Sequence, residues 1–188
     1  MKLKIVIGVT GASGAIYAKD LLMKIEKYSQ QIERCAVVFS DQARLVWQHE
    51  LGNDNPDDLK FMQYPNDSFF APFASGSGNY DVMIICPCSM GTLGRIAAGI
   101  ANDLIARTAD VMLKERRKLI LVPRETPYNL IHLKNMLELG QAGAIICPAS
   151  PSFYNNPARI DDLVETVTAR ILKLAGLKID SFEWMEKN

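Results

Sequence analysis

The chain opens with the stretch that decides its fold, since residues 3–14 read LKIVIGVTGASG. The apolar, largely β-branched run at 3–9 is typical of a buried strand in a parallel sheet. A glycine-rich turn follows at 10–14, and apolar residues then recur at helical spacing over 14–28. A strand, a glycine-rich turn and a helix in this order predict the first unit of a parallel α/β sheet.

The same alternation continues along the chain. Further strands are expected at 36–39, 61–64, 82–86, 119–122 and 144–147, and further helices at 41–50, 89–101, 104–116, 127–139 and 160–174. Leu45 and Val46 are expected to point inward, and Pro127 and Gly140 to mark the first turn and the end of one helix. The pattern predicts a three-layer Rossmann-like or flavodoxin-like α/β fold, a parallel sheet with helices on both faces, in a single domain over residues 1–188.

The composition indicates a folded protein with no excess of either charge. The chain has 188 residues, 48% of them hydrophobic, with 21 basic and 21 acidic side chains. This composition excludes a largely disordered chain, and balanced charge argues against a nucleic-acid partner, which is bound through many Lys and Arg contacts to phosphate. The apolar run at 3–9 is too short for a signal peptide or a membrane span, so we expect a cytoplasmic protein with no membrane partner.

The cysteines and histidines do not form a metal-binding pattern. Cys35, Cys86, Cys88 and Cys147 are expected to be reduced thiols near strand ends, as is usual in the cytosol. A single residue separates Cys86 from Cys88, which is not the usual spacing of zinc ligands, and only two histidines are present. We therefore expect no metal.

Hydroxyl-bearing loops carry the first functional signal. They hold Thr10, Ser13, Ser40, Ser75, Ser77, Ser89 and Thr92. We expect the loops of Thr10, Ser40 and Ser89 at the carboxyl ends of the strands, where ligands bind in open parallel sheets. Gly8, Gly11 and Gly14 are spaced G-x-x-G-x-x-G, unlike the dinucleotide or Walker patterns. Because hydroxyls suit the many oxygens of a terminal phosphate, the pattern favours a mononucleotide such as FMN. The alternative is that these residues only cap helices and form turns.

Four cations could bind phosphate groups. Arg107 and Lys114 are seven residues apart and share one helix face, Arg124 follows a strand, and Arg170 lies in the last helix. Each also has an ordinary explanation, because basic residues stabilise helix C-termini and long side chains reach out to solvent from apolar surfaces.

Two carboxylates accompany them. Glu50 closes a helix, where an acid opposes the helix dipole, so its position hints at another role. Glu125 stands next to Arg124 and could simply form a local ion pair.

Several segments together carry a resemblance to a known family. They are 10–15, 74–77, 86–93, 107–117, 121–127, 131–136, 153–154 and 169–172. Over about residues 4–174 the chain resembles the UbiX-like flavin prenyltransferases, formerly described as aromatic acid decarboxylases. The segment LVPRETP at 121–127 is the most specific match.

The resemblance implies an activity and its partners. It implies an enzyme that joins a dimethylallyl group from dimethylallyl monophosphate to reduced FMN, at N5 and then C6. The prenylated FMN would serve a UbiD-like decarboxylase. It also implies a homo-oligomer, a dodecamer, whose neighbouring subunits share active sites, and no requirement for metal.

The resemblance also assigns residues. The residues implied to contact FMN are Gly11, Ala12, Ser13, Ser40, Ser89, Met90, Gly91, Thr92 and Arg124. Those implied to bind the prenyl phosphate are Arg107, Lys114, Tyr154 and Arg170. Those implied to act at the reacting centre are Ser13, Glu50, Lys114 and Glu125. Phe69, Phe70 and Trp184 are candidates to shelter an allyl cation, although some family members carry Trp in the segment that holds the two phenylalanines.

Other functions remain open at this point. A flavin-dependent cysteine-type decarboxylase would share the fold but is expected to use a catalytic histidine, and neither His49 nor His132 is well placed. A flavodoxin-like electron carrier would be strongly acidic, unlike this neutral chain. Direct decarboxylation of aromatic acids is a third alternative, which no residue set favours.

Overall fold

The computed structural model describes residues 2–52 and 54–181, and its centre is a parallel sheet. The strands of the described residues are β1 (Leu3–Val9), β2 (Ile32–Phe39), β3 (Met62–Tyr64), β4 (Val82–Cys88), β5 (Lys118–Pro123) and β6 (Ile145–Ile146). They pair in parallel in the order β3-β2-β1-β4-β5-β6, the order of a doubly wound Rossmann sheet. The strand order reverses between β1 and β4, which makes their carboxyl ends the expected ligand-binding edge.

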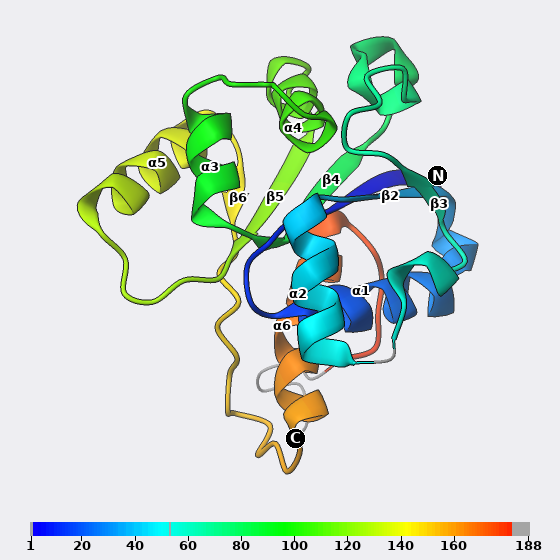
Figure 1. Cartoon of the computed structure of the whole chain (residues 1–188). Coiled ribbons are helices and arrows are strands. Elements are labelled where there is room, and N and C mark those ends of the chain that lie inside the picture. The colour runs from blue at the N-terminus through cyan, green and yellow to red at the C-terminus, as the bar shows by residue number, and fades with distance from the viewer. Residues whose placement is uncertain (1, 53, 182–188) are drawn as a thin grey trace.

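Helices cover both faces of the sheet, as the sequence predicts (Figure 1). The α-helices are α1 (Ala15–Lys27), α2 (Asp41–Leu51), α3 (Met90–Ala97), α4 (Leu104–Lys114), α5 (Leu130–Gln141) and α6 (Ile160–Ala175). Short 3-10 turns are η1 (Ser29–Gln31), η2 (Pro56–Asp58), η3 (Pro72–Ala74) and η4 (Gly76–Gly78). One core layer holds α1, α2 and α6, and the other holds η3, α3, α4 and α5.

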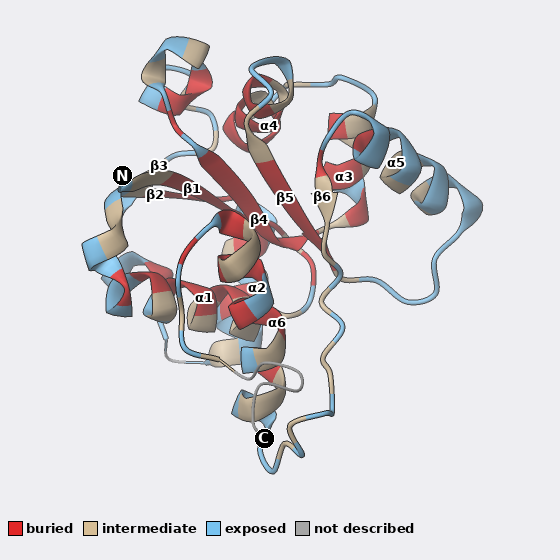
Figure 2. Ribbon diagram, turned by 180° about the vertical axis from the view of Figure 1, so that it is seen from behind, coloured by how far each residue is buried: buried red, intermediate tan, exposed pale blue. Residues whose placement is uncertain are grey.

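The strand sequences explain this layering. Ile5 and Ile7 of β1 face one core layer, while Val6 faces the other, and all three side chains are fully buried. Figure 2 shows β1, β4 and β5 buried along most of their length. A strand covered on both faces has no polar side, so it reads as a continuous apolar run.

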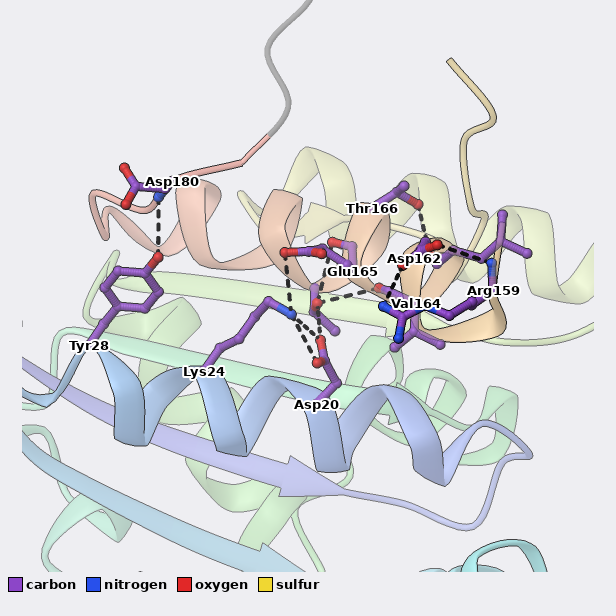
Figure 3. A network of polar contacts seen from close by, with 11 residues as sticks. Asp20, Lys24, Tyr28, Arg159, Asp162, Val164, Glu165, Thr166 and Asp180 are labelled. Carbon is purple, nitrogen blue, oxygen red and sulfur yellow. Dashed lines mark hydrogen bonds and ion pairs between the residues drawn. The ribbon is translucent and has the colours of Figure 1, made fainter. Parts of the chain in front are cut away.

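A polar seam joins α1 to α6 (Figure 3). Lys24 of α1 pairs with Asp20, one turn away, at 2.7 Å and with Glu165 of α6 at 3.8 Å. The Thr168 hydroxyl donates a hydrogen bond to Asp20. The seam fixes the last helix on the first, next to their shared apolar core.

The structure corrects one helix boundary. The helix expected from Pro127 begins at Leu130, because the side chain of Asn129 accepts the His132 N–H at 2.8 Å and caps the N-terminus. Asn is among the strongest N-cap residues. Gly140 is the penultimate residue of α5, one residue before the end of the helix.

The inward face of α2 also differs from the expectation. Leu45 is 59% exposed, and Val46 is only half-buried. Ala43 and Trp47 are buried instead, and the Trp47 ring meets Phe39 edge-on at 5.5 Å between centroids. The large indole determines which face of the helix turns to the sheet, because it has the most apolar surface to bury.

Candidate functional site

The exits of β1 and β4 are tied together by a buried hydroxyl. Thr10 is 2% exposed, and its Oγ1 donates to the Pro87 carbonyl at 2.8 Å while accepting the Ser89 N–H at 2.7 Å. Thr10, which follows β1, therefore fixes the position of Ser89, the N-cap residue of α3. We call this carboxyl edge of the sheet, with its helix N-termini, the strand-end face.

Two serines on the strand-end face cap helices. Ser40 accepts the Ala43 N–H at 3.1 Å and caps α2. Ser89 accepts the Thr92 N–H at 3.3 Å, donates to the Thr92 hydroxyl at 3.1 Å, and caps α3. The capping explanation of these hydroxyls is therefore correct, and it leaves each with remaining hydrogen-bonding capacity toward solvent or a ligand.

The N-terminus of α1 is already occupied by an anion of the chain itself. Its N-cap, Gly14, has a φ of 111° and no side chain to cap with. Glu50, in the last turn of α2, fills that role, with one carboxylate oxygen 2.9 Å from the Gly14 amide and 2.7 Å from the Ala15 amide. This explains the acid at the C-terminal end of a helix: it stabilises the positive end of the neighbouring one.

The Glu50 carboxylate is held in its ionised form. Burial opposes its charge, but hydrogen bonds from Ser13, Gly14 and Ala15, together with the nearby Arg124 guanidinium, lower the pKa of Glu50. Arg124 in turn donates from Nε to the Ser13 carbonyl at 2.9 Å. Ser13, Glu50 and Arg124 thus form one group at the reversal point of the sheet.

The first turn of α3 is accessible. Gly91 is exposed, and a Cβ built on it meets no atom within 4 Å, whereas Met90 and Thr92 on either side are buried. At Gly11 the opposite holds, because a Cβ there would lie 2.5 Å from the Gln42 side chain. Gly11 is thus needed for close packing against α2, and Gly91 is the glycine that leaves backbone open to a ligand. Ala12, which lies between Gly11 and Ser13, is buried.

A cavity of about 740 Å³ lies beside Ser40, at the carboxyl ends of β2 and β3. Its size is that of a small-molecule pocket. Its lining combines Phe39 with the acids Asp41, Asp67 and Asp103 and with one cation, Arg44. A lining of rings and mixed polar groups suits a hydrogen-bonding part of a ligand.

Three further candidates lie on exposed loops or helix surface. Glu125 is exposed, and its carboxylate accepts the Thr126 N–H at 2.9 Å. Tyr154 is 69% exposed in the segment between β6 and α6. Arg170 is exposed on α6, near enough to Cys147 that its charge opposes the rise in the pKa of that thiol caused by burial.

Arg107 and Lys114 are separated along α4: Lys114 is in its last turn, at the opposite edge of the sheet, whereas Arg107 is in its first turn, one turn after Asp103. Both are on α4, where Arg107 donates from Nε to the Ala74 carbonyl at 3.1 Å. We call residues 74–78 the ASGSG loop. It precedes β4, so its Ser75 and Ser77 lie toward the amino edge of the sheet. The seven residues of β4 separate the two edges by about 20 Å. Within one copy, then, the fold does not bring Lys114 to Arg124.

The remaining expectations concern aromatic rings and thiols. Phe69 and Phe70 are exposed, Phe70 completely, and Trp184 lies outside the described residues. The four cysteines are unpaired, and burial raises the pKa of Cys88 to about 12. Among the described residues no group of His, Cys, Asp and Glu is arranged to hold a metal ion. No helix in that part of the chain combines the length and the apolar character that a membrane crossing requires.

Two residues of the site region were not expected. Tyr17 lies against Gly14, where a Cβ would come 2.9 Å from its ring, and burial raises its pKa although Arg124 opposes this. Glu115 pairs with Lys114 at 2.8 Å. The sequence held weak signals for both, since Tyr17 sits in the first turn after the glycine-rich loop and Glu115 directly follows a candidate cation.

Comparison with known proteins identifies the family. The Flavoprotein family model matches residues 1–172. The flavin prenyltransferase UbiX of Methanocaldococcus jannaschii is 43% identical over 183 residues, which cover 96% of this chain and 97% of that protein. This chain belongs to the UbiX flavin prenyltransferase family. The UbiX of Pseudomonas aeruginosa is 41% identical over 202 residues, covering 98% of this chain and 95% of that protein.

Solved structures of UbiX proteins share the whole fold. AnUbiX (PadA1), crystallised with FMN and dimethylallyl pyrophosphate, superposes with a TM-score of 0.89 at 38% identity and covers 97% of this chain and 100% of its own. The dodecameric FMN-dependent UbiX-like decarboxylase of Escherichia coli O157:H7 has a TM-score of 0.93 at 39% identity, with the same coverage of 97% and 100%. The peptidyl-cysteine decarboxylase EpiD, at 18% identity and a TM-score of 0.63 over 94% of this chain and 100% of its own, shares the fold alone.

Proposed function

We propose that this protein is a flavin prenyltransferase that joins a dimethylallyl group from dimethylallyl monophosphate to N5 and C6 of reduced FMN. The observation that carries the proposal is the Ser13–Glu50–Arg124 group at the reversal point of a sheet belonging to the UbiX family. The complex of a 38% identical UbiX protein with FMN and dimethylallyl pyrophosphate supports both ligands.

FMN is proposed to bind on the strand-end face. The contacts would come from Gly11, Ala12, Ser13, Ser40, Ser89, Met90, Gly91, Thr92 and Arg124. The open first turn of α3 fits a phosphate, because backbone amides at a helix N-terminus bind anions and Gly91 leaves them accessible. The N-terminus of α1 does not fit one, because the Glu50 carboxylate already accepts its amides.

The prenyl phosphate is proposed to meet cations from two copies of the chain. Arg170 and Tyr154 would come from one copy, and Arg107 and Lys114 from a neighbour, since Lys114 occupies the other edge of the sheet and Arg107 shares its helix. A homo-oligomer is supported by the dodecameric relative and by the apolar surface of α5, which is exposed at Leu130, Ile131, Leu133 and Leu137.

The chemistry explains the need for these cations. The allylic C–O bond breaks with both electrons passing to the phosphate, and Arg and Lys stabilise the charge that gathers there. Reduced FMN would supply the nucleophilic N5 and C6, which form the new C–N bond and then the new C–C bond. Before the second bond forms, the double bond of the attached group must take up a proton, which makes its tertiary carbon electrophilic. C6 then attacks that carbon and loses its own proton, so the second step consumes and returns one proton. Because Glu50 is held ionised by four stabilising groups, it is a weak base, and we assign the proton to the released phosphate, with Glu50, Ser13 and Glu125 orienting the reactants.

Two finer statements belong to this proposal, and one competing function stands against it. The prenylated FMN would serve a UbiD-like decarboxylase. The chain would work in the cytoplasm, whose reducing conditions suit its unpaired cysteines. Flavin-dependent decarboxylation of a cysteine or an aromatic acid is the competing function.

An anaerobic assay tests the proposal. Purified protein is incubated with reduced FMN and dimethylallyl monophosphate, and the extracted flavin is analysed by mass spectrometry, with the diphosphate as a parallel arm. Addition of a five-carbon unit is expected with the monophosphate. Unchanged FMN together with decarboxylation of a cysteine peptide would show the proposal to be wrong.

A second assay tests the shared site. Arg124→Ala is expected to lose FMN, and Lys114→Ala to retain FMN but lose turnover. A mixed oligomer refolded from the two inactive variants should regain part of the activity, because some sites then combine two intact edges. If no mixture is active although mixed oligomers form, the sites are not shared between copies.

A further inference from the structure

Hydrogen bonds from the residues that follow α4 hold the ASGSG loop in place. Arg117 donates from Nη2 to the Gly76 carbonyl at 2.7 Å and to Asn79 Oδ1 at 3.1 Å. Arg116, with a φ of 53°, reverses the backbone after the helix, and the Arg117 N–H closes this turn on the Met112 carbonyl at 2.8 Å. The turn directs both of its flanking side chains, Glu115 and Arg117, toward the loop.

Gly76 lies directly beneath the Glu115 carboxylate. A Cβ built on Gly76 would lie 2.3 Å from Glu115 Oε1 and 2.6 Å from its Cδ. Its φ is outside the left-handed region, so the backbone alone does not require glycine. A side chain at residue 76 would therefore displace the carboxylate from its present position.

The same carboxylate holds Lys114. Glu115 Oε1 accepts from Lys114 Nζ at 2.8 Å, and Oε2 lies 3.9 Å from Arg117 Nη2. The Ser75 and Ser77 hydroxyls of the ASGSG loop are 3.1 Å apart. Lys114 is thereby bonded to a carboxylate that lies beside a loop bearing two hydroxyls.

We propose that Glu115 is a positioning residue that holds the Lys114 ammonium against the ASGSG loop for binding of the prenyl phosphate. The inference rests on the proposed function, in which Lys114 binds that phosphate. An ammonium has three donors, so a bond to Glu115 leaves two for the ligand. A lysine held in advance loses less side-chain entropy on binding, which increases affinity. Arg107 and Arg117 keep the surroundings positive although Glu115 cancels one charge.

Glu115→Gln tests the proposal, because it preserves the volume and removes the charge that holds Lys114. The expected result is an increase of about tenfold in KM for dimethylallyl monophosphate, with kcat within twofold and FMN affinity unchanged. Glu26→Gln is the matched control, since Glu26 is an exposed carboxylate 3.6 Å from the exposed Lys60. It should match the unsubstituted protein.

A second pair of variants keeps the charges and tests the contact itself. Gly76→Ala pushes a methyl group into Glu115 and should raise KM as Glu115→Gln does. In the Gly76→Ala/Glu115→Ala double variant the collision is gone, so its KM should equal that of Glu115→Ala alone; such non-additivity is the signature of direct contact. Additive effects, or an unchanged KM in Glu115→Gln, would overturn the positioning role.

Failure of the proposed function is distinguishable. If the unsubstituted protein prenylates no FMN, calorimetric titration with dimethylallyl monophosphate still measures the affinity that Glu115 is inferred to support. Weaker binding by Glu115→Gln than by Glu26→Gln then upholds the positioning role without the reaction, and equal binding refutes it.

Discussion

Replacing Glu50 by alanine should destabilise the fold as well as the reaction. Glu50 accepts the amides of Gly14 and Ala15 at 2.9 and 2.7 Å, and glycine at the N-cap offers no substitute. Loss of an N-cap costs about 0.5–2 kcal/mol, and loss of an acid at the positive end of the helix dipole about 0.3–1 kcal/mol. These effects overlap at an exposed site, so we expect about 1.5 kcal/mol for Glu50→Ala.

The expected signal is a fall in melting temperature. A chain of this size loses about 2–4 °C for each kcal/mol, so Glu50→Ala should melt about 3–6 °C lower in differential scanning calorimetry at pH 7 and fixed protein concentration. Glu26→Ala, which removes an exposed acid of α1, serves as the control and should shift the melting temperature by less than about 1–2 °C.

The effect of Glu50 should depend on pH in a defined direction. The folded pKa lies below the unfolded value, which is near 4.5, so the stabilisation is complete above that pH and is lost as the pH falls through the folded pKa. The difference in stability between the unsubstituted protein and Glu50→Ala should therefore be constant from pH 7 to about 5 and shrink as the pH falls further. Equal melting temperatures at pH 7, or a difference that grows as the pH falls below 5, would refute the capping role.

Three further predictions follow from single features. Thr10→Val leaves the Ser89 amide without its partner, so we expect a loss of about 1–3 kcal/mol in chemical denaturation and weaker FMN binding; unchanged stability would mean that water replaces the hydroxyl. Leu137→Glu places a charge on the apolar surface of α5 and should reduce the mass of the assembly in light scattering, whereas an unchanged mass would exclude α5 from the interface. Cys88, fully buried with a pKa raised to about 12, should resist alkylation at pH 8 in the native protein and react after unfolding; rapid native labelling would contradict its burial.

The sheet was predictable from sequence because its strands are buried on both faces. β1, β4 and β5 are continuous apolar runs, and each was expected within a few residues of its observed bounds. Helix ends were less predictable, because two start signals competed near α5. Pro127 favoured an early start, but only Asn129 offers a side chain that reaches the N–H groups of the first turn.

The residues of the candidate site were predictable from the sequence, but their separation between the two edges of the sheet was not. Ser13, Ser40, Ser89 and Arg124 follow strands in the sequence, so their meeting at one edge follows from a parallel sheet. The partner of Glu50 was not predictable, since its contact to Ala15 spans 35 residues and depends on how α1 and α2 pack. An acid at the end of a helix was the one local signal of that contact.

The ASGSG loop shows that the composition of a loop does not predict its place in the sheet. Its composition resembles that of the strand-exit loops, but it stands before β4 instead of after it. Position relative to the strand, and not composition, decides which edge of a parallel sheet a loop occupies. That distinction separates Lys114 from Arg124 within one copy.

The pairing of α1 with α6 delays the completion of one core layer during synthesis of the chain. The Thr168 hydroxyl reaches Asp20 across 148 residues, and Gln31 exchanges two hydrogen bonds with the backbone of Lys178 across 147. At about 5–20 residues per second, a ribosome needs roughly 7–30 s to proceed from α1 to α6. For that interval one layer of the core lacks α6, so the apolar residues that α6 covers stay exposed on the nascent chain until the last helix emerges.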